Sequence, residues 1–220
     1  KADVAIVATP TFVHARHSVY ALRKGLHVLC EKPMAIDPGQ CDEVIKTARE
    51  AGRMLTVGHV LRFWPEYVYL KKAIDSRELG ELRTLSMTRV GGVTRGWRNW
   101  FLDESLCGTQ IFDRHIHDSD LVLWLLGKPR AVRTVGRTEA VGGTLHCFTH
   151  YEFPHVTAHA EGSADCAPRF PFTMAFTAVF ERGTLQYSNR LSPTLTLYRE
   201  DGEVVVPTLP NPLGEAATGY

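Results

Sequence analysis

Two short stretches of the sequence carry the side chains best suited to acid–base chemistry. Cys30-Glu31-Lys32-Pro33 follows a short apolar run, and a lysine there can act as a general acid or hold a substrate hydroxyl. Asp113 and His117 are four residues apart, so on a helix they share one face and can converge on one bound molecule. A carboxylate that orients an imidazole prepares a general base near neutral pH. The alternatives are a solvated loop lysine and a polar pair that only packs a helix.

The elements that must position these side chains alternate in the first sixty residues. Asp37 and Pro38 supply an N-cap and a first helical residue. Short connections between strands and helices are typical of βαβ units, whose right-handed crossovers build a parallel, doubly wound sheet. Lys32 then follows the carboxyl end of a strand, where such sheets bind ligands. The predicted strands are 4–9, 27–30 and 54–57, and the predicted helices are 14–24 and 38–51.

The pattern changes after about residue 61. Residues 1–60 are predicted to be part of a parallel, doubly wound α/β sheet. Residues 61–220 are predicted to be an α+β domain with a mainly antiparallel, open sheet. An irregular aromatic stretch lies at 91–106. The predicted helices of this part are 65–76 and 109–126, and the predicted strands are 81–90, 131–137, 144–153, 156–164, 172–180, 184–189 and 195–199.

Aromatic, amide and guanidinium side chains are unusually dense around the predicted start of the second domain. Aromatic faces stack on the C–H faces of a sugar-like polyol, and amide or guanidinium groups bind its hydroxyls. Ordinary packing of loop aromatics is the alternative. The residues concerned are Arg62, Trp64, Tyr67, Trp97, Asn99 and Trp100.

His115 and His117 raise the question of a metal site. Residues two apart on a helix point roughly 200° apart, so these two imidazoles cannot face one ion unless the segment is extended. We therefore predict no metal, and a metal-dependent hydrolase remains a remote alternative. The pairs His146/His150 and His155/His159 lie on predicted strands and are interpreted as sheet-surface residues.

Composition excludes several classes of protein. The 220 residues are 44% hydrophobic and carry a formal net charge of +1, which offers no basic field for a nucleic acid. No apolar run approaches the roughly 18 to 20 residues that span a bilayer, and the first residues do not resemble a secretory signal. The five cysteines form no C-x-x-C pair and are interpreted as reduced thiols. A cytoplasmic protein is expected.

Three motifs together resemble one family of enzymes. They are the strand and turn Val4-Ala5-Ile6-Val7-Ala8-Thr9-Pro10, the segment from Gly25 through Glu31-Lys32-Pro33 to Ala35, and Val57-Gly58-His59 with Arg62-Phe63. Asp113-Arg114-His115-Ile116-His117-Asp118-Ser119-Asp120 further resembles an Asp-x-x-x-His-x-x-Asp helix of that family. The sequence is thus similar, over about residues 1–130, to the Gfo/Idh/MocA family of nicotinamide-dependent oxidoreductases.

The resemblance implies that residues 1–60 are the C-terminal part of a Rossmann-type, dinucleotide-binding domain and that residues 61–220 are the substrate-binding and oligomerisation domain. It also implies a role for each motif residue. His117 would take the proton from a substrate hydroxyl while hydride leaves the same carbon for NAD or NADP, Lys32 would hydrogen-bond that oxygen, and Asp113 would orient the substrate or His117. Thr9, Pro10, His14 and Glu31 would line the cofactor together with Lys32. Arg62, Trp97, Asn99 and Trp100 are the expected substrate-binding residues. His115, which stands where the family often has glycine, would add a substrate contact.

Two features of the family are absent from the 220 residues. They are the Gly-x-Gly-x-x-Gly turn and the acidic residue that reads the ribose, so NAD and NADP cannot be told apart. Two βα units of about 30 residues each would supply both, so an N-terminally truncated fragment is expected. We predict that this chain alone binds cofactor poorly or not at all, which a titration of NADH fluorescence tests.

The leading interpretation is therefore a sugar or polyol dehydrogenase. The alternative from another class is a non-catalytic, homo-oligomerising remnant of the same family. In either case the antiparallel sheet is expected to form a homodimer or homotetramer, because an open sheet with an uncovered face needs a partner.

Overall fold

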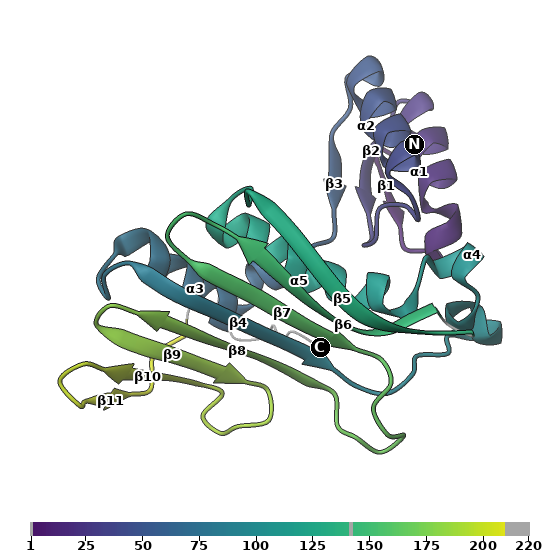
Figure 1. The fold of residues 1–220 in the computed structure, drawn as a ribbon. Coiled ribbons are helices and arrows are strands. Elements are labelled where there is room, and N and C mark those ends of the chain that lie inside the picture. Colours follow the sequence, from purple (N-terminus) through teal and green to yellow (C-terminus); the bar gives the residue numbers. More distant parts are fainter. Residues whose placement is uncertain (1, 141–142, 210–220) are drawn as a thin grey trace.

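The computed structural model describes residues 2–140 and 143–209 and contains two separate sheets (Figure 1). The smaller sheet is parallel with the strand order β1-β2-β3, as the βαβ pattern predicts. Strand β1 ends earlier than expected, because the chain leaves the sheet before Pro10. The elements of this part are β1 (Val4–Val7), α1 (His14–Arg23), β2 (His27–Cys30), α2 (Pro38–Ala51) and β3 (Leu55–Val57).

Both helices of this part pack on the same face of the small sheet. Alternation in β1 and β2 sends Val7, Val28 and Cys30 to that face, where they form a core with apolar residues of α1 and α2. The predicted cap is present, since the Asp37 side chain accepts a hydrogen bond from the Gln40 amide at 3.0 Å. The opposite face of β1 exposes Val4 and Ile6.

The larger sheet has eight strands in the order β11-β10-β9-β8-β4-β7-β6-β5. All neighbouring pairs are antiparallel except β4 with β7, so the prediction of a mainly antiparallel sheet is confirmed. The short last strand had no sequence signal. The strands are β4 (Leu82–Val90), β5 (Ala131–Glu139), β6 (Gly143–Glu152), β7 (Thr157–Ser163), β8 (Thr173–Phe180), β9 (Gly183–Ser188), β10 (Leu195–Arg199) and β11 (Val204–Val205).

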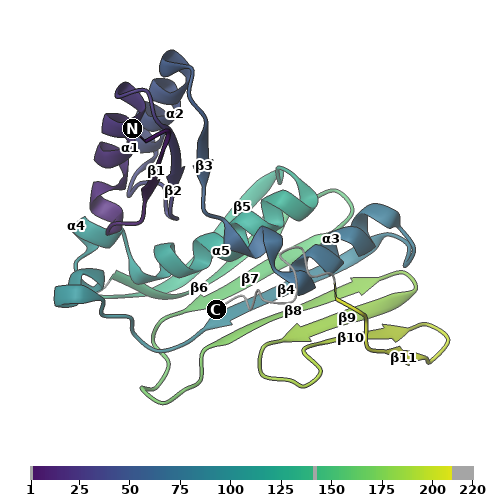
Figure 2. The ribbon, with the colours of Figure 1, turned by 180° about the vertical axis from the view of Figure 1, so that it is seen from behind.

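Two helices cover one face of this sheet and leave the other face open (Figures 1 and 2). They are α3 (Pro65–Ser76) and α5 (Gln110–Leu126), and α5 crosses β6, β7 and β4. Thr109 caps α5, because its hydroxyl accepts a hydrogen bond from the Phe112 amide at 3.0 Å. The core between helices and sheet contains Tyr67, Leu85, Met87, Leu121 and Phe176.

The irregular aromatic stretch forms short helical pieces next to α1. A 3-10 helix at Trp97–Leu102 is kinked by left-handed backbone at Arg98 and Asn99, and α4 (Glu104–Cys107) follows it. The five cysteines are free thiols. Within residues 2–140 and 143–209, no helix is long and apolar enough to cross a membrane, and no cluster of three or more His, Cys, Asp or Glu side chains is arranged to hold a metal ion.

Candidate active site

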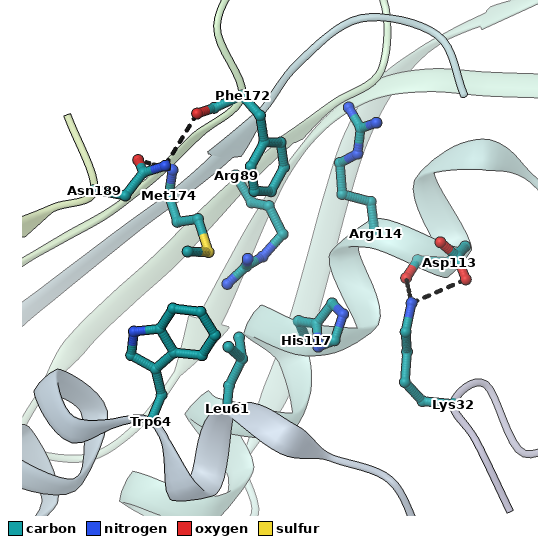
Figure 3. Close-up of a pocket in the computed structure, with 10 residues that line it drawn as sticks. All are labelled: Lys32, Leu61, Trp64, Arg89, Asp113, Arg114, His117, Phe172, Met174 and Asn189. Carbon is teal, nitrogen blue, oxygen red and sulfur yellow. Dashed lines mark hydrogen bonds and ion pairs between the residues drawn. The ribbon is translucent and has the colours of Figure 1, made fainter. Parts of the chain in front are cut away.

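A cavity of about 610 Å³ opens where the loop after β2 meets α5 and the large sheet (Figure 3). This volume suits a small organic molecule. The cavity brings together all three predicted catalytic residues, although Lys32 lies more than eighty positions before Asp113 and His117 in the chain. Its lining residues are Lys32, Leu61, Trp64, Arg89, Asp113, Arg114, His117, Phe172, Met174 and Asn189.

Lys32 reaches across from the small sheet to the first turn of α5. Its Nζ donates hydrogen bonds to the main-chain carbonyl oxygen and to carboxylate Oδ1 of Asp113, both at 3.0 Å. The two side chains are only 17% and 23% exposed, so water screens the pair incompletely. The Lys32–Pro33 peptide bond is cis. Because an ammonium has three donors, two bonds to Asp113 leave one hydrogen for an oxygen in the cavity.

His117 lies one turn after Asp113 on the same face of α5, as their spacing predicts. Burial lowers the pKa of His117 to about 2, with further lowering by the charges of Arg89, Lys32 and His59. The imidazole is therefore neutral at physiological pH, and one of its two ring nitrogens carries no proton. Its Nδ1 is buried without a hydrogen-bond partner among the described residues.

Arg89 forms the inner wall of the cavity. It is 2% exposed and extends from β4, where Nε and Nη2 donate to the two carboxylate oxygens of Asp118 at 2.9 Å each. Burial disfavours the charge of Arg89, but Asp118 more than offsets this effect, so the pKa of Arg89 is raised. The hydroxyl of Tyr67 accepts a further, longer bond at 3.4 Å. The ion pair with Asp118 therefore fixes the positively charged Arg89 guanidinium in the cavity wall.

Sequence analysis did not identify most of the remaining wall. Phe172, Met174 and Asn189 come from β8 and the turn after β9, and no local pattern marks them. Asn189 joins this wall, because its Oδ1 accepts from the Met174 amide at 2.8 Å and its Nδ2 donates to the Phe172 carbonyl at 3.1 Å. Arg89 did have a usable signal, since a charge at the inward positions of an apolar strand needs a buried partner.

The predicted cofactor residues gather at the carboxyl ends of the parallel strands. Thr9 and Pro10 follow β1, and Glu31 follows β2 next to Lys32. His14 is buried, with its Nδ1 2.7 Å from the Pro33 carbonyl oxygen and its Nε2 2.5 Å from that of Thr9. It therefore ties the two loops together instead of presenting its ring to the cavity.

Glycine at position 58 leaves room for the carboxylate of Glu31. A Cβ atom on Gly58 would lie 3.1 Å from Glu31 Oε2, which is tighter than ordinary contact. The loops after β1, β2 and β3 thus lie together at the carboxyl end of the small sheet, and Lys32 of the second loop lines the cavity. This arrangement fits the nicotinamide end of a dinucleotide, which open α/β sheets hold outside the carboxyl ends of their strands.

The cavity is not lined by the predicted substrate-binding residues Arg62, Trp97, Asn99, Trp100 and His115, although Trp64 of the predicted aromatic group does line it. Arg62 pairs instead with Asp120, its Nε donating to Oδ2 at 2.9 Å. His115 points to the other side of α5, where its Nε2 lies 2.9 Å from Thr149 Oγ1. His115 points away from the cavity that His117 lines, because residues two apart on a helix are rotated by about 200° about its axis.

Trp97, Asn99 and Trp100 lie in the kinked segment that contacts Phe12, just before α1. Trp97 is 68% exposed, with the Arg98 guanidinium 4.5 Å from its ring centroid. Trp100 stacks on Phe101 at 3.9 Å and meets Phe12 edge-on at 6.1 Å. Asn99, between them, adopts a φ of 59°. These side chains shape the kinked segment, and the cavity takes its aromatic surface from Trp64 and Phe172.

Individual proteins with related sequences or folds include several enzymes. D-glucoside 3-dehydrogenase of Escherichia coli K12 is 33% identical over 167 residues, which are 74% of this chain and 47% of that protein. 2,7-Anhydro-N-acetylneuraminate hydratase of the same organism is 32% identical over 143 residues, which are 64% and 38% of the two chains. The chain therefore spans less than half the length of these two relatives.

A solved structure and two family models agree with this similarity. Levoglucosan dehydrogenase in complex with NADH and levoglucosan superposes with a TM-score of 0.85 over 99% of this chain and 66% of that one, at 19% identity, so it shows the fold alone. Residues 1–59 match the model described as "Oxidoreductase family, NAD-binding Rossmann fold". Residues 67–186 match the "GFO/IDH/MocA C-terminal domain". The chain belongs to the Gfo/Idh/MocA family of oxidoreductases.

Proposed function

We propose that the protein transfers a hydride between NAD or NADP and the hydroxyl-bearing carbon of a sugar or polyol. One observation carries this proposal: Lys32, Asp113 and His117 face a single cavity at the carboxyl ends of a parallel sheet. An ammonium donor, a carboxylate and a neutral imidazole are the groups that oxidation of an alcohol requires. The dehydrogenases among the relatives named above support the same reaction class.

The nicotinamide, when bound, accepts or returns the hydride, and side chains of the protein accept or donate the proton. His117 takes the proton of the substrate hydroxyl at a ring nitrogen, which is free because burial keeps the imidazole neutral. Lys32 donates its remaining N–H to the same oxygen and stabilises the developing negative charge. Asp113 holds Lys32 Nζ in place through the two 3.0 Å contacts.

Position at the carboxyl ends of the parallel strands suggests the cofactor contacts. Thr9, Pro10 and Glu31 stand at the ends of β1 and β2, next to Lys32. We assign these residues to the nicotinamide side, with His14 as the residue that fixes their loops. Residues 1–60 then bind the cofactor, and residues 61–220 bind the substrate and form the contacts of the oligomer.

Isotope transfer tests the reaction directly. The complete gene product that contains these 220 residues is incubated with NAD or NADP and a panel of neutral sugars and polyols, sugar acids and sugar phosphates, each carrying deuterium at one carbinol carbon. We expect deuterium in the reduced nicotinamide, and its loss in Lys32→Ala and His117→Ala variants. A folded protein that reduces neither cofactor with any member of the panel would favour the non-catalytic alternative.

The open face of the large sheet supports a homo-oligomer. Val135 on β5 is 54% exposed, and its partner residue Phe148 on β6 is 50% exposed, so the two form an apolar spot on the uncovered face. We propose that two copies pair through this face as a homodimer, or as part of a homotetramer. Light scattering should give a multimer for the wild type and a monomer for Val135→Glu/Phe148→Glu, and a monomeric wild type would contradict the proposal.

A further inference from the structure

The cavity has more positive than negative side chains in its wall. Lys32, Arg89 and Arg114 line it, whereas Asp113 is the carboxylate that does so. Lys32 is paired with Asp113, and Arg89 is paired with Asp118 behind the wall. Across the described ranges, no carboxylate lies within 4.0 Å of the Arg114 guanidinium. Arg114 is therefore the cation of this wall whose charge has no counterpart.

Arg114 is nevertheless held firmly. Its guanidinium donates to the Ser163 carbonyl oxygen, to the Gly92 carbonyl oxygen at 3.0 Å and to Thr94 Oγ1 at 3.1 Å. All three acceptors are neutral. A guanidinium has five N–H donors, so donors remain for a bound molecule after these three bonds. The ring of Phe172 lies 5.7 Å from the guanidinium carbon and shields this side of the group.

Arg89 presents a second donor to the same space. Nε and Nη2 are used by Asp118 and Tyr67, and no residue in 2–140 or 143–209 accepts a hydrogen bond from Nη1. Figure 3 shows the Arg89 guanidinium directed between Trp64 and His117. Its orientation is set before any ligand arrives, because Asp118 holds it bidentately.

The cavity wall carries a positive potential. Burial lowers the pKa of Arg114, Asp113 acts in the opposite direction, and the charge of Arg89 lowers it further. Positive groups also act on His117, where the charges of Arg89 and Lys32 add to the effect of burial. An oxidised nicotinamide adds another positive charge at this place. A negatively charged group on the substrate would offset this positive potential. It could bind Arg114 without breaking an existing ion pair, because Arg114 has none among the described residues.

We propose that the substrate carries an anionic oxygen group, a carboxylate or a phosphate, which Arg114 binds while the reacting hydroxyl lies between Lys32 and His117. The substrate class is then a sugar acid or a sugar phosphate, and neutral polyols are poor substrates. Arg114 directly follows Asp113 on α5, and its side chain projects away from Lys32 (Figure 3). One molecule in the cavity can therefore contact Lys32 at one end and Arg114 at the other. This inference rests on the proposed function, which places the reacting hydroxyl.

Matched sugars test this inference. The probes are three neutral hexoses, glucose, galactose and mannose, each with its uronate and its 6-phosphate. Binding to the complete gene product is measured by saturation-transfer NMR, which needs no turnover, and kcat/KM is measured with NAD and NADP. We expect the wild type to prefer one kind of anion over the neutral sugar, and the uronate and phosphate arms identify which.

Variants of Arg114 connect this preference to one residue. Arg114→Gln should lower kcat/KM for the preferred anionic sugar by about 10- to 100-fold, the loss of one charge-assisted hydrogen bond, mostly through KM. Its effect on the matched neutral sugar should be much smaller, and Arg114→Lys should retain most of the preference. Arg95→Gln is the control, because Arg95 is an exposed arginine of the neighbouring loop that does not line the cavity.

The outcomes separate this inference from the proposed function. Wild-type protein that shows no preference for the acid or the phosphate in any of the three sets overturns the inference, even if hydride transfer is observed. A preference that is unchanged in Arg114→Gln overturns it as well. Anionic sugars that bind through Arg114 without hydride transfer support the inference and contradict the proposed function.

Discussion

Lys32 Nζ and Asp113 Oδ1 lie 3.0 Å apart although eighty-one positions separate the two residues in the chain. This contact joins the loop after β2 to the first turn of α5, and it directly links the cofactor side to the substrate side of the cavity. The ammonium is thereby directed into the cavity before a ligand binds. Preorganised donors of this kind contribute more to catalysis than donors that must reorient.

Removal of either partner should slow hydride transfer. Lys32→Met removes the donor to the reacting oxygen, and we expect kcat to fall by about 10²- to 10⁴-fold. Asp113→Asn keeps an acceptor but removes the charge that holds Nζ, so its loss should be smaller. Steady-state kinetics of the complete gene product measure both. Lys128→Met, at an exposed lysine after α5, is the control and should match the wild type.

The buried imidazole of His117 should make stability depend on pH. Its pKa is about 2 in the folded chain and near 6.5 when unfolded, so below pH 6.5 the unfolded state binds a proton that the folded state does not. Stability then falls as the pH falls through this window, by up to about 1.4 kcal/mol per pH unit. Urea unfolding at pH 7 and pH 5 should show a smaller loss for His117→Gln than for the wild type.

A matched histidine controls this measurement. His155→Gln changes an exposed residue of the turn between β6 and β7 and should keep the wild-type pH dependence. Equal losses of stability in the wild type and in His117→Gln would mean that His117 is solvated or charged in the folded chain.

The ion pair between Arg89 and Asp118 should be costly to break from one side. Asp118→Ala leaves a buried guanidinium without its carboxylate, and we expect a loss of about 3 to 5 kcal/mol in the free energy of unfolding. Arg89→Met/Asp118→Leu removes both charges and should recover most of that loss. Urea unfolding of the three proteins measures the difference. A loss below about 1 kcal/mol in Asp118→Ala would show that water reaches the pair.

Gly58→Ala should weaken cofactor binding with little effect on stability. The added Cβ meets the Glu31 carboxylate at 3.1 Å, and this flexible side chain can move away. If Glu31 contacts the nicotinamide side, its displacement should raise KM for the cofactor several-fold. The double variant Glu31→Ala/Gly58→Ala should then be no worse than Glu31→Ala alone, whereas additive losses would place the effect of Gly58 elsewhere.

Local spacing in the sequence was enough to identify much of the molecule. Apolar periodicity marked the helices and most strands, and the Asp37 cap marked the start of α2, because these signals depend on neighbouring residues alone. The helical repeat also placed Asp113 and His117 on one face and turned His115 away from it. These local signals did not reveal β11, because a strand of two residues has no periodicity.

Only the tertiary structure decided which side chains surround the substrate cavity. Arg89, Phe172 and Asn189 come together because β4 pairs with β8 and β8 with β9, and these pairings join residues that are distant in the chain. The aromatic cluster around Trp97 and Trp100, conspicuous in the sequence, packs beside α1 instead. Strand pairing depends on the sum of many long-range contacts, whereas a helix face depends on spacing within one segment, so only the second can be read from the residues in order.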